Sequence, residues 1–234
     1  MNGETMRRWT FCLFILMTSR VFASGHPTLA VLDFENNSIF KANEYRVLSQ
    51  GLAEILISEF DRFEDIQIVE RRKMNHLLDE LKLSQSGLMQ NDLSVQVGKM
   101  LGVQYFVFGA FLVGYDDRMR IDVRIVEVET GLTVKSQDIT GKTKQVLDLI
   151  QKLSRGLIKD LDIKGNRKKG SESIRGERID MNALVQFSHG VVHEDLGELQ
   201  MARDFYMKAL SLEPDFSRAQ ERLQIVDHRL RSGN

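Results

Sequence analysis

The stretch VGKMLGVQYFVFGAFLVGYDDRMRIDVRIVEVETG, residues 97–131, decides the fold. From Gln104 to Leu112 almost every residue is apolar or small, which predicts a strand covered on both faces. Residues 119–125 then alternate strictly between apolar and charged side chains, which predicts a strand with one face in a core and one in water. Because just Gly114–Arg118 separates the two segments, we expect a hairpin with a tight turn.

The alternation of the second strand changes phase near its end. Val126 and Val128 become the apolar positions, and Glu127 and Glu129 the charged ones. One extra residue in a strand inverts the facing of every side chain that follows it. The pattern therefore predicts a β-bulge near Ile125 and Val126.

The flanking segments predict a mixture of strands and helices. Strands are expected at residues 28–34, 65–69 and 132–139, and helices at residues 45–60, 74–81, 92–101 and 144–161. Asp92 is suited to begin the third helix as its N-cap, and Gly102 to follow its end. This order predicts an α/β fold over residues 24–162, a two-layer mixed sheet flanked by helices.

The first 23 residues have the pattern of a secretory signal peptide. Arg7 and Arg8 precede the apolar run at 11–17, and cleavage is expected after Ala23. Cys12, the single cysteine, lies inside this run, so the mature chain would contain no disulfide. Lipid attachment at Cys12 is the alternative; the bulky residues before it argue against that role. The net charge of −1 gives no indication of nucleic-acid binding.

Residues 163–179 contain six Lys or Arg residues and few large apolar ones apart from Ile163, Ile174 and Ile179, a composition typical of a flexible basic linker. Contact of this run with an anionic membrane surface is the alternative interpretation.

Residues 180–234 resemble a tetratricopeptide repeat followed by a capping helix. Small residues, an aromatic and a proline recur at the spacings of that repeat, and Gly197 marks the turn between its helices. The matching residues are Ala183, Gly190, Ala202, Tyr206, Ala209 and Pro214. Gln186 departs from the pattern, which has a large aromatic there. The expected fold class is therefore α/β with a small all-α C-terminal module.

The resemblance implies a protein-binding face on the first helix of the repeat. The residues at that face are Leu184, Phe187, Val191 and Glu194. One repeat with a cap buries little core by itself, so the module is expected to dock on the α/β domain, another subunit or a partner. The alternative is that these four residues pack against the chain's own linker or domain.

Catalytic patterns are sparse. His189 and His193 are four residues apart on a helix and would face the same side, yet without a third ligand they are weak candidates for a metal site. Glu64, Asp65 and Glu70 lie near Arg71, Arg72 and Lys73, which favours a surface charge network. Asp116 and Asp117 suit a turn. With no phosphate-binding loop or serine elbow, we expect a non-enzymatic protein that needs no cofactor.

Taken in order, four segments resemble the CsgG family, the curli production assembly/transport components. They are LAVLDFENN at 29–37, GLAEIL at 51–56, IVERR at 68–72 and VGKMLGVQYF at 97–106, with Gly109; IDVRIVEVETG at 121–131 extends the likeness. The resemblance covers roughly residues 28–160. It implies a periplasmic domain with a mixed sheet flanked by helices. Related domains in this group include periplasmic activators of peptidoglycan synthases.

The sequence departs from the pore-forming members of that family in two ways. Those members carry a lipidated cysteine after the signal peptide and two long membrane hairpins. Here the hairpin sites hold Gly114–Arg118 and the residues TGKT at 140–143. A membrane-spanning strand needs about 9–11 residues. We therefore expect no membrane-spanning segment in the mature chain.

These observations lead to three functional hypotheses. The first is an exported, non-enzymatic periplasmic protein-binding or assembly component related to curli-type secretion, with homo-oligomerisation possible through the α/β domain. The second is a periplasmic regulator that docks on a peptidoglycan synthase. The third is a metal-dependent hydrolase that uses His189 and His193. The protein is expected in the periplasm, with peripheral contact to the outer membrane as an option, and its partners are expected to be envelope proteins.

Overall fold

The computed structural model describes residues 26–71, 74, 98–161, 166, 168 and 177–232. The predicted signal peptide with Cys12, most of the helices expected at 74–81 and 92–101, and most of the expected linker at 163–179 lie outside these residues. Gly102, expected to follow a helix, has the predicted left-handed conformation with a φ of 65°.

The described strands form one mixed sheet. Its order is β3-β1-β4-β5-β6, with β2 beside β4. Strands β1, β2 and β3 run parallel to their neighbours, whereas β4, β5 and β6 form an antiparallel meander. Their bounds are β1 Thr28–Val31, β2 Glu35–Asn36, β3 Gln67–Ile68, β4 Tyr105–Val113, β5 Arg118–Glu127 and β6 Thr133–Lys142. The predicted α/β class and the predicted hairpin of residues 105–127 are thus confirmed.

Alternate residues of the meander point to different cores. The odd-numbered residues of β5 from Met119 to Ile125 are buried on the face that carries the helices, and Arg120 and Arg124 lie exposed on the other face. The prediction that β4 is covered on both faces is wrong for most of its length. Among the residues that the structure describes, Phe106 and the half-buried Phe108 of its second face belong to a small cluster, whereas Leu112 further along is 42% exposed.

The phase change at Val126 has a different cause from the one expected. A register shift does lie between Ile125 and Val126 in the pairing of β5 with β6. The unpaired residue is Val134 of β6, however, because Ile125 pairs with Lys135 and Val126 with Thr133. The pairing of β5 with β4 continues without interruption. Val126 therefore faces the second side of the sheet, where Val128 joins the small cluster.

The third strand of the meander continues further than predicted. β6 extends to Lys142, and the short 3₁₀ helix η2 (Thr143–Gln145) leads directly into α4 (Val146–Asp160). Residues 140–143, expected to be a connection, are therefore mostly strand. The turn between β4 and β5 is closed by the Gly114 N–H, which donates to the Arg118 carbonyl over 2.8 Å.

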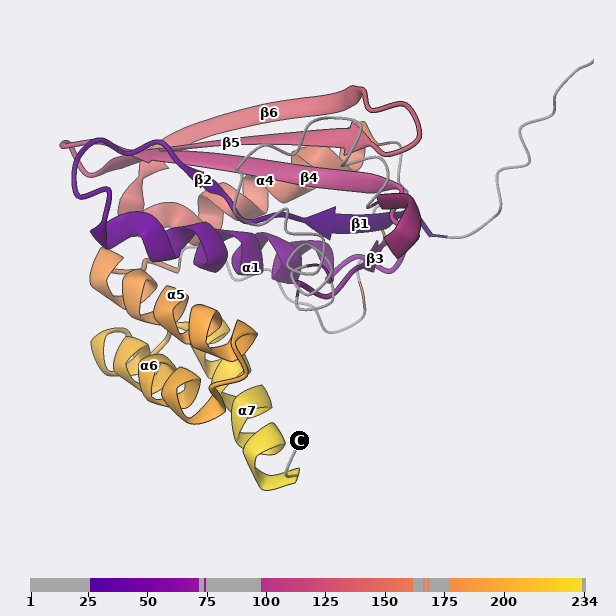
Figure 1. Cartoon of the computed structure of the whole chain (residues 1–234). Coiled ribbons are helices and arrows are strands. Elements are labelled where there is room, and N and C mark those ends of the chain that lie inside the picture. Colours follow the sequence, from indigo (N-terminus) through magenta and orange to yellow (C-terminus); the bar gives the residue numbers. More distant parts are fainter. Residues whose placement is uncertain are drawn as a thin grey trace, which may run out of the picture.

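Helices cover one face of the sheet in two layers (Figure 1). The first layer contains α1 (Leu48–Phe60), which follows the short helix η1 (Glu44–Val47), and α4. The second layer is α5 (Met181–Asp195), which lies along the outer side of α1, with α6 (Leu199–Leu212) and α7 (Ser217–Ser232) beyond it. We call residues 26–161 the platform and α5–α7 the helical module. One apolar core runs from the sheet through α1 into the helical module.

Candidate functional site

The four side chains predicted to bind a partner lie at the junction of the platform and the helical module. Leu184, Phe187, Val191 and Glu194 are exposed by 1%, 0%, 3% and 3%. The three apolar ones belong to the same core as α1. Phe187 packs on Tyr206 and Phe216, and Glu194 pairs with Arg222 and Arg229, so this face of α5 is buried within the chain. Its role in binding a partner stays a prediction. Its geometry corresponds to the alternative considered from the sequence, packing against the chain's own domain.

The junction depends on a close approach of two helices at Gly51. A Cβ atom at Gly51 of α1 would lie 1.9 Å from the Ser188 Oγ of α5 and 2.7 Å from the Ser188 Cβ. The Ser188 hydroxyl is buried and donates to the Leu184 carbonyl over 2.8 Å. The absence of a side chain at position 51 therefore lets α5 lie directly against α1. Gly51 begins the segment GLAEIL, one of those that carry the CsgG resemblance.

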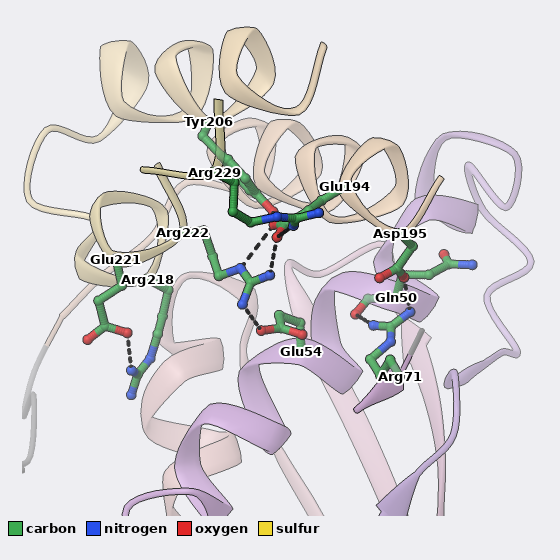
Figure 2. Close-up of polar contacts among 10 residues, drawn as sticks. All are labelled: Gln50, Glu54, Arg71, Glu194, Asp195, Tyr206, Arg218, Glu221, Arg222 and Arg229. Carbon is green, nitrogen blue, oxygen red and sulfur yellow. Dashed lines mark hydrogen bonds and ion pairs between the residues drawn. The ribbon is translucent and has the colours of Figure 1, made fainter. Parts of the chain in front are cut away.

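Beside this contact, Glu194 is the centre of a buried polar cluster (Figure 2). Its carboxylate accepts from the Tyr206 hydroxyl over 2.9 Å and pairs with Arg222 at 2.6 Å and Arg229 at 2.9 Å. Arg222 also reaches Glu54 of α1 at 3.2 Å. Burial and the neighbouring Glu194 charge raise the pKa of the Tyr206 hydroxyl, which therefore stays protonated as a donor. The charged residues of this cluster thus join α1, α5 and α7, and the hydrogen bond of Tyr206 adds α6.

A second cluster centres on Arg71, which follows β3. Its side chain is 4% exposed, and its Nη2 atom lies 2.8 Å from both Asp33 of the platform and Asp195 at the end of α5. The Nη1 atom donates to the Gln50 carbonyl over 2.7 Å. Arg71 therefore joins two platform segments to the helical module (Figure 2). The prediction of a surface charge network is wrong for this residue, because α5 covers it.

Asp195 has a perturbed acidity. Burial raises the pKa of this carboxyl to about 6, and the opposing effect of Arg71 is offset in part by the nearby acids Asp33, Glu54 and Glu194. The carboxyl therefore gains a proton near neutral pH more readily than an exposed Asp does.

A third ion pair lies at the other end of the junction. Arg218 of α7 contacts Glu59 of α1 at 2.6 Å, and both side chains are 6% exposed. Arg218 also pairs with Glu221 one turn along α7. Since Glu54 and Glu59 both pair with α7, this helix is fixed along α1 at two points.

The sequence interpretation missed the role of these charges. Ala219 and Val226 of α7 are buried, as is Phe216 just before the helix, whereas Leu230 is 38% exposed. Arg218, Arg222 and Arg229 all turn toward the junction. Their spacings of four and seven residues place them on one helix face. This spacing could have indicated from the sequence that the three arginines meet a common acidic surface.

The two candidate metal ligands contact an aromatic ring instead. His189 and His193 both stack on Phe205 of α6. The centre of the Phe205 ring lies 4.9 Å from that of the His189 ring and 5.0 Å from that of the His193 ring. The His193 Nδ1 atom also contacts Glu198. Burial, together with the charges of His193 and Lys208, lowers the pKa of His189. Over the part of the chain that the structure describes, no group of three or more His, Cys, Asp or Glu side chains is arranged to hold a metal ion.

The remaining acidic candidates are dispersed. Asp65 lies 3.6 Å from His26, and Asp116 is 3.9 Å from Arg118 in the turn after β4. Asp117 has a φ of 56°, a conformation that Asp tolerates in turns. None of the helices described here is both long and apolar enough to cross a membrane.

Comparison with known proteins gives a family match over part of the chain. Residues 14–117 match the model of the curli production assembly/transport component CsgG. This stretch includes β1 to β4 and α1, and it ends in the turn before β5. The search of curated proteins found no significant match.

Several solved structures show a distant likeness. The LpoB C-terminal domain from Salmonella enterica has 18% identity and a TM-score of 0.41, over 52% of this chain and 87% of that one. TolB from Acinetobacter baumannii has 13% identity and a TM-score of 0.41, over 62% and 30%. A PelC dodecamer from Paraburkholderia phytofirmans has 14% identity and a TM-score of 0.32, over 58% and 88%. The likeness to a known family therefore rests on residues 14–117, where the match supports a CsgG-like domain.

Proposed function

We propose that this chain is a non-enzymatic, exported protein-binding component of the periplasm, related to curli-type secretion and lacking the membrane-spanning hairpins of the pore-forming members. The observation that carries the proposal is the junction itself. A helical module is joined to a CsgG-like domain by buried ion pairs and a continuous apolar core. A partner protein would therefore meet the platform and the helical module as one composite surface.

The helical module supports a protein-binding role through its repeat-like packing. A Cβ atom at Gly190 would lie 2.4 Å from the Tyr206 ring, so α5 and α6 cross closely where the repeat pattern has its small residue. Gly197, with a φ of 78°, turns the chain between them. We infer that α5–α7 act as a tetratricopeptide-like unit whose first helix already binds α1.

A partner that uses Leu184, Phe187, Val191 and Glu194 would have to open the packing around α5, where Phe187 contacts Tyr206 and Phe216 and Glu194 pairs with Arg222 and Arg229. This can be tested with the variant Gly51→Ala, which is expected to loosen the contact of α5 with α1. Stronger capture of a partner by the variant than by the wild type would support binding at the α5 face. Equal capture would place the binding surface elsewhere.

The proposed function is tested by affinity capture from envelope extracts with the purified mature chain, residues 24–234. Recovery of surface-fibre or secretion components is the expected result. Recovery of peptidoglycan synthases would favour the second hypothesis, regulation of a cell-wall enzyme, and recovery of neither would count against both. The variant Ile225→Glu, which changes an exposed position of α7, serves as the control and should capture the same proteins as the wild type.

Export is tested separately. A fusion of residues 1–30 to a reporter enzyme that is active only outside the cytoplasm should give activity, and Arg7→Glu with Arg8→Glu should reduce it. Metal analysis of the purified protein addresses the third hypothesis. Stoichiometric metal that is lost on changing His189 to Ala would revive a hydrolase role.

A further inference from the structure

The outer side of α6 carries a row of side chains that the junction does not use. Met201, Phe205, Lys208 and Leu212 follow spacings of four, three and four residues, so they lie on one helix face. Met201 is 47% and Leu212 49% exposed, and Lys208 is also exposed. The opposite side of α6 is buried through Ala202, Tyr206 and Ala209. We call these four residues the α6 stripe.

The middle of the α6 stripe is held in place by its neighbours. The Phe205 ring stacks on His189 and His193 of α5, and the Lys208 ammonium lies 4.5 Å from the centre of the same ring. Phe205 is therefore a half-buried, fixed aromatic between two exposed apolar side chains. A fixed apolar row on a helix is suited to receive another helix.

The order of residues along the α6 stripe is self-complementary. If a second α6 runs antiparallel, with the twofold axis between Tyr206 and Met207, Met201 faces Leu212 of the second copy. Phe205 then faces Lys208 of the second copy, so a cation–π contact across the interface would replace the one that Lys208 makes with Phe205 of its own chain. Asp204, which is exposed beside the stripe, comes within one residue of Lys208 of the second copy. Each contact occurs twice, as in any twofold interface.

We propose that the α6 stripe is a homodimer contact, occupied by the α6 stripe of a second copy of this chain. The surface differs from the α/β domain through which oligomerisation was expected from the sequence, and the proposal does not depend on the envelope function. A single helix pair covers less than the about 1,200 Å² of a standard interface, so the dimer should be weak, with a Kd on the order of 10–100 μM.

Sedimentation equilibrium of the mature chain measures this association directly. Wild type should fit a monomer–dimer equilibrium. Met201→Glu with Leu212→Glu should abolish it, because both changes place charges at the facing apolar positions. Ile225→Glu on α7 should leave it unchanged. Circular dichroism checks that each variant keeps its helices.

Charge reversal tests the antiparallel arrangement. Asp204→Lys or Lys208→Asp alone should weaken dimerisation by about tenfold or more, because like charges then face each other. The double variant Asp204→Lys with Lys208→Asp should dimerise more tightly than either single variant, because the Asp–Lys pairs are restored with opposite sign while the contact of Lys208 with Phe205 stays lost. Failure of the double variant to recover would overturn the arrangement.

Cross-linking gives a second and independent measurement. In the mature chain, which contains no cysteine of its own, a mixture of Met201→Cys and Leu212→Cys proteins should form a mixed disulfide faster than either protein alone. A chain that stays monomeric to several hundred micromolar overturns the proposal. So does a dimer that is insensitive to the stripe variants, or a monomer whose stripe binds an added amphipathic helical peptide.

Discussion

The substitution Gly51→Ala tests whether α5 truly lies against α1. In an open helix, replacing Gly by Ala stabilises a protein by about 1 kcal/mol, because Ala loses less conformational freedom on folding. At position 51 the new methyl group would lie 1.9 Å from the Ser188 Oγ and 2.7 Å from the Ser188 Cβ. Overpacking of this kind costs about 1–3 kcal/mol. The expected net effect is therefore a loss of about 0–2 kcal/mol in the free energy of unfolding, in place of a gain of about 1 kcal/mol.

The clash cannot be relieved by rotating the hydroxyl alone, because the Ser188 Cβ is itself too close. Replacing Ser188 by Gly removes both atoms and leaves the Ser188 Cα at 3.2 Å. In a double-mutant cycle, Ser188→Gly should therefore be less harmful in the Gly51→Ala background than in the wild type. A coupling of about 1 kcal/mol or more is expected for residues in direct contact.

Urea unfolding followed by circular dichroism measures all four proteins of the cycle. Gly156→Ala in α4 is the matched control. There the added Cβ meets the end of the Gln137 side chain, which is flexible, so the change should be neutral or stabilising. If Gly51→Ala stabilises the protein as much as Gly156→Ala, α5 does not pack on α1 as described and the reasoning fails.

Three further changes probe the buried charges, all measured by urea unfolding. Glu194→Gln should cost about 3 kcal/mol, since it leaves Arg222 and Arg229 without their common carboxylate; a loss below about 1 kcal/mol would contradict the cluster. Tyr206→Phe should cost about 1–2 kcal/mol through the lost hydrogen bond to that carboxylate. It should cost less in the Glu194→Gln background, where the acceptor is a neutral amide oxygen instead of a charged carboxylate. The third change concerns the pH dependence of stability. The pKa of Asp195 is about 6 in the folded protein, above the ordinary 3.8, so folding favours the protonated carboxyl. The stabilisation from this proton is present below pH 4 and is lost as the pH rises through 6. Relative to wild type, Asp195→Asn should gain up to about 2 kcal/mol between pH 4 and pH 7; a constant difference would exclude a raised pKa.

The hairpin of β4 and β5 was predictable because its signal is local. Met119, Ile121 and Val123 face a core while Arg120 faces water, and this alternation needs no knowledge of the neighbouring strands. The bulge shows where such inference ends. The sequence of β5 indicates that something changes at Val126, yet the unpaired residue is Val134 on the partner strand. Register depends on both strands of a pair, so the pattern of one strand cannot assign it.

The junction could not be predicted for a related reason. Arg71 stands in a run of charged residues, which in an exposed segment forms a solvated surface. It is buried because α5, more than a hundred residues later in the chain, covers it and supplies Asp195. Likewise, the α5 residues that suit a peptide groove are buried within the chain's own core, and Phe187 packs on Tyr206 and Phe216. A helix face that can bind a partner can equally bind the chain's own helix, and composition does not distinguish the two.

Three segments that resemble the CsgG family meet at this junction. Asp33 lies at the end of LAVLDF, Glu54 lies within GLAEIL, and Arg71 lies within IVERR. Arg71 pairs with Asp33 and with Asp195, and Glu54 pairs with Arg222 of α7. If the helical module were absent, Glu54 would lose this ion-pair partner and Arg71 one of its two carboxylates. The charges of the CsgG-like domain and those of the helical module therefore compensate each other, and we expect the two parts to unfold as one cooperative unit rather than in two steps.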